Sequence, residues 1–401
     1  MEKAAEHDSR RQTTHVIEIH HTGVSMTSTI HYVKTIVCFS VTILCGMAGQ
    51  TTAQESKSQV SPLPEKSEVM QRIAFGSCAK HWQYQPIWET VIARKPDLFL
   101  FLGDAIYADN DGKTAWEVTK QQLQGEWNRL ADKPEFQRFR ATVPMMATWD
   151  NHDYGTHDGG AEFKLKEVSK RIFLDFFSEP LGSPRRQRAG IFDAKFFGPE
   201  GKRVQVILLD TRTFRGPFKL DERSKAERAK IGKVGGYVPH DDRSIPMLGD
   251  AQWVWLEQQL RKPADVRLVC SSTQIVPDQK GMDEWGCYPH ERQRLFDLID
   301  NTRANGVILL SGNVHFAEVS KVETKAYPLL DFTSSGLTHI NEAYAKSENE
   351  YQVAGPFTKL NFGIVEIDWG TKSFAQITLK AIGDDGTAGF SHRVSLGDLQ
   401  P

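Results

Sequence analysis

The stretch "VILLSGNVHFAEVS" (307–320) joins a strand-like apolar run to an abrupt polar end. Four apolar residues are followed at once by Ser-Gly-Asn and then by His315. A short apolar run bounded by turn residues is typical of a strand that is covered on both faces. The polar end has two interpretations. His315 is either a core histidine bonded to one backbone carbonyl, or part of a ligand site shared with Asn313.

Three more apolar runs end in polar side chains. "RIAFGSC" (72–78) ends in a cysteine, "LFLFLGD" (98–104) in an aspartate, and "VPMMATWDNHD" (143–153) in a cluster of Asp, Asn and His. We expect these strands to lie side by side in one sheet. Because ligands gather beyond the carboxyl ends of strands in open α/β sheets, the polar residues are expected at one rim.

Helix-like segments separate the strands. Pro86 opens the first of them, and "LGDAQWVWLEQQL" (248–260) is the clearest, with Asp250 as its expected N-cap. "PHERQRLFDLID" (289–300) is another, and the end of the chain, 361–382, alternates with period two as a hairpin does. Further strands are expected at 203–212 and 266–274. Alternating strands and helices with an antiparallel end predict an α/β fold of two mixed sheets covered by helices.

The polar residues at the strand ends are candidate metal ligands. Each has an ordinary structural explanation as well: a cysteine can be a small buried hydrophobe, an aspartate a turn former, and a tyrosine half-buried packing. Those separate explanations do not account for their shared position beyond a strand. The candidate ligands are Cys78, Asp104, Tyr107, Asp150, Asn151, Asn313 and His315.

The types of donor indicate two ions. A carboxylate such as Asp104 can bridge two metals about 3.5–4 Å apart. A phenol with a pKa of about 10 needs a strong Lewis acid to ionise at neutral pH, so Tyr107 beside a thiolate favours ferric iron over zinc. The oxygen donors of Asp150, Asn151 and Asn313 suit Ca²⁺, Mg²⁺ or Mn²⁺.

Composition limits the class of protein. The 401 residues are 25% charged with a formal net charge of -2, as in a soluble globular protein. This balance gives no indication of a basic nucleic-acid-binding surface. We expect a monomer that binds a small substrate.

The N-terminal region has the pattern of an export signal. Residues 1–25 resemble an over-long start, and 26–53 a signal peptide, in which Lys34 precedes an apolar run too short to span a bilayer. A membrane anchor is the alternative. Residues 54–68 are expected to form a flexible leader and 69–401 a single domain. We therefore predict a secreted or periplasmic protein with no transmembrane span in the mature chain.

Cysteine usage is compatible with export. Removal of the signal leaves Cys78, Cys270 and Cys287. Cys270 and Cys287 could pair in an oxidising compartment, but their spacing does not require it. An odd number of cysteines leaves at least one thiol free.

Several motifs together resemble the PhoD-like (alkaline phosphatase D) branch of the calcineurin-like metallophosphoesterases, over about residues 70–380. They are "FGSC", "FLGDAIYAD", "TWDNHDYGTHDGG", "LLDTRTFRG", "MLGDAQWVWLEQQL" and "LLSGNVHFAEVS". The resemblance implies a four-layer α/β/β/α sandwich and hydrolysis of phosphoric esters with Fe³⁺ and Ca²⁺, or with Mg²⁺, Mn²⁺ or Zn²⁺ as the second metal.

The resemblance also implies roles for individual residues. Cys78, Asp104, Tyr107 and His315 would hold iron, with Asp104 bridging to calcium. Asn151 would occupy the second-metal position. Asn151 and Asn313 stand where many relatives have Asp, so each removes a negative charge from that side. His157 stands where Asn is common in relatives.

The expected reaction is in-line attack on phosphorus by a metal-bound hydroxide. His152 would contact a phosphoryl oxygen or protonate the leaving group. Arg212 and Arg215 would clamp the phosphate, with surface ion pairs as the alternative. The main alternative function is a non-catalytic, metal-dependent binding protein for phosphorylated glycans or lipids. A sulfate or carboxylic ester hydrolase is less supported, since no Gly-x-Ser-x-Gly motif occurs. The sequence does not separate monoesters from diesters.

Overall fold

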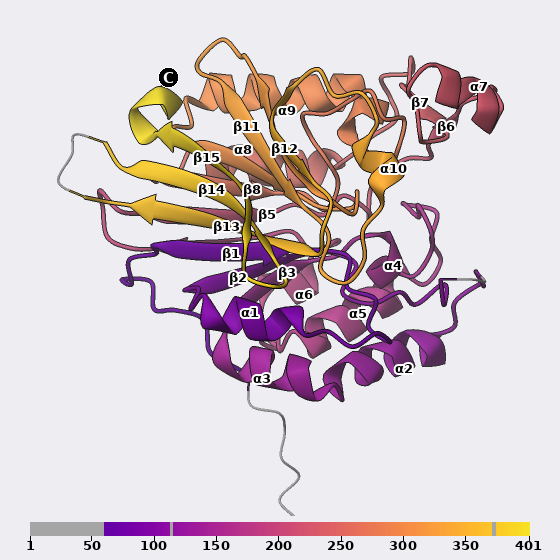
Figure 1. Ribbon diagram of the computed structural model, residues 1–401, viewed down its shortest axis with the longest axis horizontal. Coiled ribbons are helices and arrows are strands. Elements are labelled where there is room, and N and C mark those ends of the chain that lie inside the picture. The colour runs from indigo at the N-terminus through magenta and orange to yellow at the C-terminus, as the bar shows by residue number, and fades with distance from the viewer. Residues whose placement is uncertain (1–59, 113–114, 371–373) are drawn as a thin grey trace, which may run out of the picture. The chain divides into compact units, whose positions relative to one another are not determined.

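The computed structural model describes residues 60–112, 115–370 and 374–401 (Figure 1). The expected start at Met26, the signal peptide and the leader up to residue 59 lie outside the described residues. Within them, every helix is too short or too polar to cross a bilayer.

The described part of the expected leader is held against the domain. The backbone N–H of Ser61 donates to the carbonyl of Arg140 at 2.9 Å. Residues Val60 to Leu63 also line a cavity with Met146 and Phe177. The first four described residues of the expected leader thus contact the domain, and the flexibility of the leader stays a prediction.

A six-stranded mixed sheet contains the first three strands of the chain. Its order is β15-β14-β13-β1-β2-β3, with β1, β2 and β3 parallel and the other neighbours antiparallel. The strands are β1 (Arg72–Gly76), β2 (Leu98–Leu102), β3 (Met145–Thr148), β13 (Asn361–Asp368), β14 (Gln376–Gly383) and β15 (Ala388–Ser395). The pair β13 and β14 confirms the hairpin expected at the end of the chain.

A seven-stranded mixed sheet contains the strand that ends before His315. Its order is β12-β10-β11-β9-β8-β5-β4, and its centre, β11-β9-β8-β5, is parallel. The strands are β4 (Asp193–Phe197), β5 (Val204–Leu208), β8 (Val266–Cys270), β9 (Val307–Ser311), β10 (Ala317–Val322), β11 (Leu329–Ser334) and β12 (Gln352–Phe357). A separate two-stranded ribbon, β6 (Lys219–Leu220) and β7 (Tyr237–Val238), lies outside both sheets.

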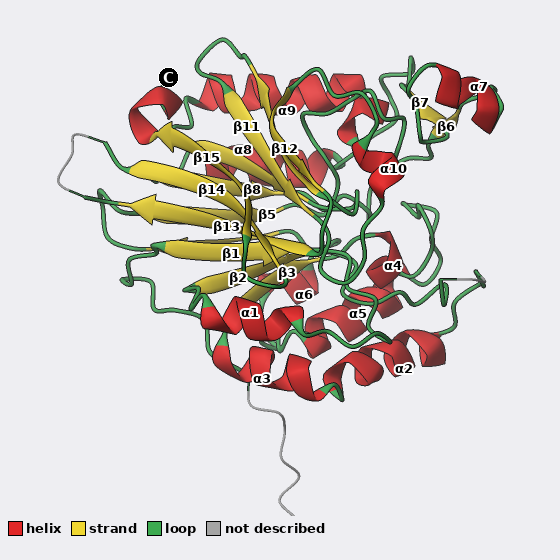
Figure 2. Ribbon diagram, viewed as in Figure 1, coloured by secondary structure: helices red, strands yellow, loops and turns green. Residues whose placement is uncertain are grey.

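Helices cover the outer faces of both sheets, as Figure 2 shows. Four pack on the six-stranded sheet: α1 (Ile87–Ala93), α2 (Lys120–Ala131), α3 (Pro134–Thr142) and α5 (Lys166–Phe176). Two further helices, α8 (Asp250–Leu260) and α9 (Pro289–Thr302), pack on the seven-stranded sheet. The short helices are α4 (Asn151–Tyr154), α6 (Pro184–Gln187), α7 (Lys225–Lys230), α10 (Glu342–Ala345), η1 (Trp285–Cys287) and η2 (Leu396–Leu399). This is the expected α/β/β/α sandwich.

Strand β2 shows how the sequence fills two cores at once. All five of its residues are buried, and alternate side chains point to opposite faces. Leu98, Leu100 and Leu102 join the core between the sheets, while Phe99 and Phe101 join the core beneath the helices. Phe75 of β1 contacts Phe332 of β11 across the sheets, with ring centroids 4.8 Å apart. An apolar run without alternation in polarity is therefore required here.

Two expectations about local structure need correction. The metal-candidate strands lie in two sheets rather than one, because β9 pairs with β8 and β11 whereas β1, β2 and β3 pair with one another. The sheets stack face to face, so their strand ends still meet. Helix α8 is capped by Gly249, whose φ of 72° lies outside the helical region, and Asp250 is its first helical residue.

Gly103, which follows β2 and precedes Asp104, packs closely against Asp150 after β3. Its φ is 96°, and a Cβ placed there would lie 2.4 Å from Cβ of Asp150 and 2.6 Å from the Asp150 backbone nitrogen. No side chain can be accommodated without moving the chain that carries Asp150.

We expect Gly103→Ala to lower the free energy of unfolding by at least about 2 kcal/mol, measured by chemical denaturation. Gly125→Ala is the matched control. Gly125 lies in the middle of α2, and a methyl group at this position would have no neighbouring atom within 4 Å. This change should raise the free energy of unfolding by about 0.5–1 kcal/mol, because alanine favours helix. Equal effects of the two substitutions would contradict the packing argument.

Candidate metal centre

Four of the candidate ligands adopt left-handed backbone conformations. Cys78 (φ 63°), Asp104 (φ 55°), Asn313 (φ 72°) and His315 (φ 62°) are four of the eight non-glycine residues with positive φ among the residues that the structure describes. Each such conformation costs about 1–3 kcal/mol and persists only where surrounding contacts impose it. The strain is concentrated where strands stop and turn their side chains toward a common point, which is typical of a functional site.

Cys78, Asp104 and His315 form the first cluster of donors. One ligand atom from each lies within 4.8 Å of the others, and all three side chains are largely shielded from solvent. The thiol Sγ of Cys78 is 3.4 Å from Oδ2 of Asp104. The two sheets thus bring together residues separated by more than 200 positions, as the sequence predicted.

Tyr107 extends this cluster toward a histidine that the sequence analysis missed. Its hydroxyl lies 3.2 Å from Nε2 of His339, which in turn lies 3.3 Å from Nε2 of His315. The Tyr107 ring stacks on His152 with centroids 4.2 Å apart. His339 follows β11 and the segment Ser334 to Leu337, so a fifth strand end with a histidine was the available signal.

Burial makes the charged forms of these donors unfavourable. It raises the pKa of the Cys78 thiol and the Tyr107 phenol well above their usual ranges, and neighbouring acidic groups add to both effects. Burial, followed by the carboxylates of Asp150 and Asp153, raises the pKa of Asp104. Burial lowers the pKa of His315 to about 3, so this imidazole is neutral. A neutral imidazole beside three acidic donors fits a cation, which would supply the positive charge that the cluster lacks.

A second set of donors lies next to Asp104. Oδ1 of Asn151 and Oδ2 of Asp150 are buried and have no hydrogen-bonding partner among the residues that the structure describes. The Nδ2 of Asn313 donates to the carbonyl of Asp283 at 2.9 Å, and its Oδ1 forms no hydrogen bond with any residue that the structure describes. Unpartnered buried oxygens are costly, and a divalent cation would satisfy those of Asp150 and Asn151, with the half-buried Asn313 beside them as a further candidate ligand.

His152 is held by a buried carboxylate. Its Nδ1 lies 2.6 Å from Oδ1 of Asp109, and its backbone N–H donates to Oδ1 of Asp104 at 3.3 Å. Since a carboxylate only accepts, Nδ1 carries the proton and Nε2 is the nitrogen left for a ligand. Asp109, two residues beyond Tyr107 in "YADN", was missed in the sequence because it follows no strand directly.

The structure corrects the predicted phosphate clamp. Arg212 is fully buried, and its Nε donates to Oδ1 of Asp150 at 2.9 Å. It also forms an ion pair with Asp283. Arg215 is buried as well, with hydrogen bonds to the carbonyls of Gly216 and Asp158. Both guanidinium groups bond protein acceptors, although Nε of Arg215 has no hydrogen-bonding partner among the described residues, and spacing along the sequence could not show these contacts.

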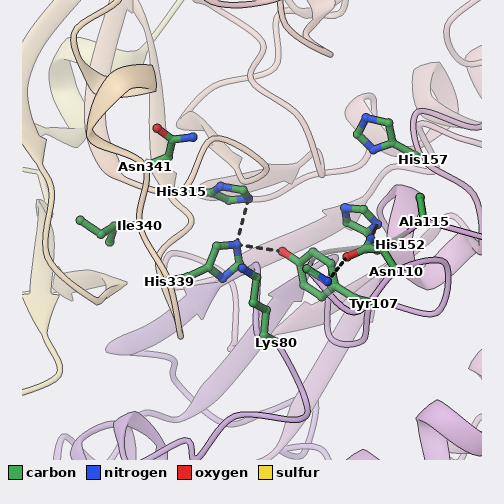
Figure 3. A pocket seen from close by; sticks show the side chains of 11 residues that line it. Lys80, Tyr107, Asn110, Ala115, His152, His157, His315, His339, Ile340 and Asn341 are labelled. Atoms are coloured by element: carbon green, nitrogen blue, oxygen red, sulfur yellow. Dashed lines mark hydrogen bonds between the residues drawn. The ribbon is translucent and has the colours of Figure 1, made fainter.

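Two cavities open onto the metal centre and share His152, His157 and His315. The first, of about 470 Å³, is the Lys80 cavity, drawn in Figure 3. The second, of about 340 Å³, is the Tyr237 cavity, which the ribbon β6–β7 partly walls. The candidate donors therefore lie at the junction of two spaces large enough for small organic groups.

The three cysteines in the described part of the chain, Cys78, Cys270 and Cys287, are buried and free. Cys270 lies in β8 and Cys287 in η1, and the Cys287 thiol donates to the carbonyl of Met282 at 3.1 Å. The pairing that the sequence left open is not formed.

Comparison with known families agrees with this geometry. The family described as PhoD-like phosphatase matches residues 73–361. The chain belongs to the PhoD-like phosphatase family. The matched region contains every candidate ligand from Cys78 to His315, and the family consists of phosphoric ester hydrolases, as the resemblance in the sequence implied.

Two PhoD relatives support the assignment at different levels. Alkaline phosphatase D of Bacillus subtilis (strain 168) is 21% identical over 307 residues, covering 68% of this chain and 51% of that protein. The chain thus spans about half the length of this curated relative. The solved "Structure of PhoD" aligns with a TM-score of 0.59 at 17% identity, covering 84% of this chain and 73% of that one. This second likeness shows a shared fold.

Glu284, behind the Tyr237 cavity, makes the stability of this PhoD-like protein depend on pH. Burial raises the pKa of Glu284 to about 7, against the partial opposition of Lys280. A glutamate in the unfolded chain has a pKa of about 4.3. Folding therefore takes up a proton between these values, and the contribution of Glu284 to stability falls as pH rises through this window.

We expect Glu284→Gln to become more stable relative to the parent by about 2–3 kcal/mol between pH 4.5 and pH 8, since glutamine mimics the protonated acid. Denaturant unfolding at a series of pH values measures the difference. Glu342→Gln, at an exposed position of α10, is the matched control. A Glu284→Gln difference that does not change with pH would contradict the burial argument.

Proposed function

We propose that the protein is an exported, metal-dependent hydrolase of small phosphoric esters. The observation that carries this proposal is the junction itself. Thiol, carboxylate, phenol and imidazole donors converge beside the His152–Asp109 pair, where two cavities meet, in a member of a phosphatase family. Export is proposed from the signal-like segment that begins near Met26.

The donor types support two different cations. Cys78, Asp104, Tyr107 and His315 would hold Fe³⁺, because a thiolate and a phenolate together suit a strongly Lewis-acidic ion. Asp104 would be shared with Ca²⁺, or with Mg²⁺, Mn²⁺ or Zn²⁺. The oxygens of Asp150, Asn151 and Asn313 would complete that second site. When bound, such cations lower the pKa of water and neutralise phosphoryl charge.

His152 is the residue best placed to handle a proton. Its Nδ1 lies 2.6 Å from Oδ1 of Asp109, which leaves Nε2 for a ligand, and His152 lines both cavities. In the imidazolium form Nε2–H would donate to a phosphoryl oxygen or to the leaving alkoxide. Asp109 fixes the ring orientation, as an aspartate does in other acid–base pairs.

Arg212 takes a positioning role in place of the clamp. Its guanidinium lies between Asp150 and Asp283, and both carboxylates keep the pKa of Arg212 raised although burial lowers it. It binds Oδ1 of Asp150 and so leaves Oδ2 available to a cation. Phosphoryl charge would then be met by the cations and His152 rather than by arginine.

The iron assignment predicts a coloured protein. Protein purified without chelator should contain iron by elemental analysis and should show a visible phenolate-to-ferric absorption band. Tyr107→Phe should abolish the band and leave the far-UV circular dichroism unchanged. Tyr154→Phe, another buried tyrosine, whose hydroxyl donates to the Gly160 carbonyl at 2.9 Å, should keep it. A colourless, iron-free enzyme with full activity would contradict the assignment of iron and favour zinc or manganese in its place.

His152→Ala should lower kcat for p-nitrophenyl phosphate and bis(p-nitrophenyl) phosphate by at least about 10²-fold, because it removes the proton donor. Metal content should stay at the parent level, since the imidazole is not needed as a ligand. Unchanged turnover would exclude His152 from the reaction. Absence of turnover in the parent protein for both esters would instead favour the non-catalytic binding protein.

A further inference from the structure

The two cavities at the metal centre differ in charge. Lys80 contributes an ammonium group to the Lys80 cavity, and no carboxylate from the described residues lines that space. The Tyr237 cavity is lined by Asp158 and by Asp283, of which Asp283 is paired with Arg212 behind the lining, and no lysine or arginine among the described residues lines this cavity. A substrate lying across the junction therefore meets a cation on one side and carboxylates on the other.

Lys80 is held by its backbone while its ammonium group remains unengaged. Its N–H donates to Oγ1 of Thr338 at 2.7 Å, and its carbonyl accepts from Nε2 of Gln85 at 3.3 Å. Its Nζ makes no hydrogen bond or ion pair with any residue that the structure describes. The side chain is partly buried. A partly desolvated cation without a counter-ion is poised to bind an anion.

The other polar groups of the Lys80 cavity are compatible with an anionic ligand. His315 and His339 line this cavity, and their Nε2 atoms lie 3.3 Å apart. Asn110 and Asn341 add amide groups to the lining (Figure 3). This cavity offers hydrogen bonds and one positive charge.

The Tyr237 cavity is suited to an uncharged group. Leu220, Val234 and Met282 supply apolar surface. The Tyr237 ring stacks on Phe218 with centroids 4.3 Å apart, and its hydroxyl donates to Asp158, so the aromatic wall is fixed. The carboxylate beside that wall disfavours a second anion.

We propose that Lys80 binds an anionic group of the substrate, a carboxylate or a second phosphate, that is separate from the reacting phosphoryl group. The uncharged alcohol of the same substrate then occupies the Tyr237 cavity. This inference rests on the proposed hydrolase activity and extends it to substrate selection. A phosphodiester can place one ester group in each cavity from the junction at His152, so the charge difference orients it.

Three p-nitrophenyl phosphodiesters that differ only in the second alcohol test this inference. Their second groups are 2-carboxyethyl, 2-phosphonoethyl and propyl, so charge varies at similar size. Lys80→Met should raise KM for the carboxyethyl and phosphonoethyl esters about 3- to 10-fold and leave kcat and KM for the propyl ester unchanged. Of the two anionic esters, the one whose KM rises more in Lys80→Met carries the anion that Lys80 prefers. Raising the ionic strength should weaken the same discrimination in the parent.

Two variants provide controls. Lys80→Arg keeps the charge and should retain most of the preference. Lys321→Met removes a lysine of β10 that is paired with Glu323 and lines neither cavity, and should change nothing. An equal rise in KM for all three esters would indicate that Lys80 binds the reacting phosphoryl group, and would overturn the inference. Unaltered kinetics of Lys80→Met would overturn it also. If the parent cleaves none of the esters, the proposed hydrolase activity itself fails.

Discussion

The burial of several carboxylates around Asp104 is the constraint on which the site depends. Asp104, Asp150 and Asp153 are all nearly inaccessible to solvent. Burial raises the pKa of Asp104, and repulsion from the carboxylates of Asp150 and Asp153 raises it further. Each of these carboxylates accepts hydrogen bonds from specific donors. Arg212 and Ser272 bind one oxygen of Asp150, and the backbone N–H groups of Ile106 and Asp150 bind Asp153. The carboxylate oxygens that remain without a hydrogen bond are those that would bind a cation.

This arrangement explains why the arginine next to the site is structural. A guanidinium that reached a substrate would leave Asp150 and Asp283 buried without a counter-charge, at a cost of several kcal/mol. Arg212 instead remains between them. Apart from bound cations and His152, the side chain that can offer positive charge to a ligand is Lys80, which lies on a loop after β1 and has no acidic partner among the described residues. The fully buried Arg212 therefore neutralises carboxylates inside the protein, whereas the partly buried Lys80 is available to a ligand.

The sequence allowed the fold class and most of the donors to be predicted. Apolar runs that end in Cys78, Asp104 and His315 carried the signal because strand and turn are both local properties. The assignment to one sheet was wrong, since strand pairing depends on contacts between distant segments. His339, Asp109 and Lys80 were missed because each lies one or more residues beyond a strand end, where loop geometry decides the direction of the side chain.

By itself the sequence determined which segments become buried strands and which donor types stand at their ends, because periodicity and residue chemistry are written in short stretches. Only the tertiary structure decided that Cys78 and His315 meet within 4.8 Å, that Arg212 faces inward, and that two cavities of unlike charge share three histidines. These outcomes depend on how two sheets stack and on which charges must be neutralised inside. Those are properties of the whole packed molecule and not of any one segment.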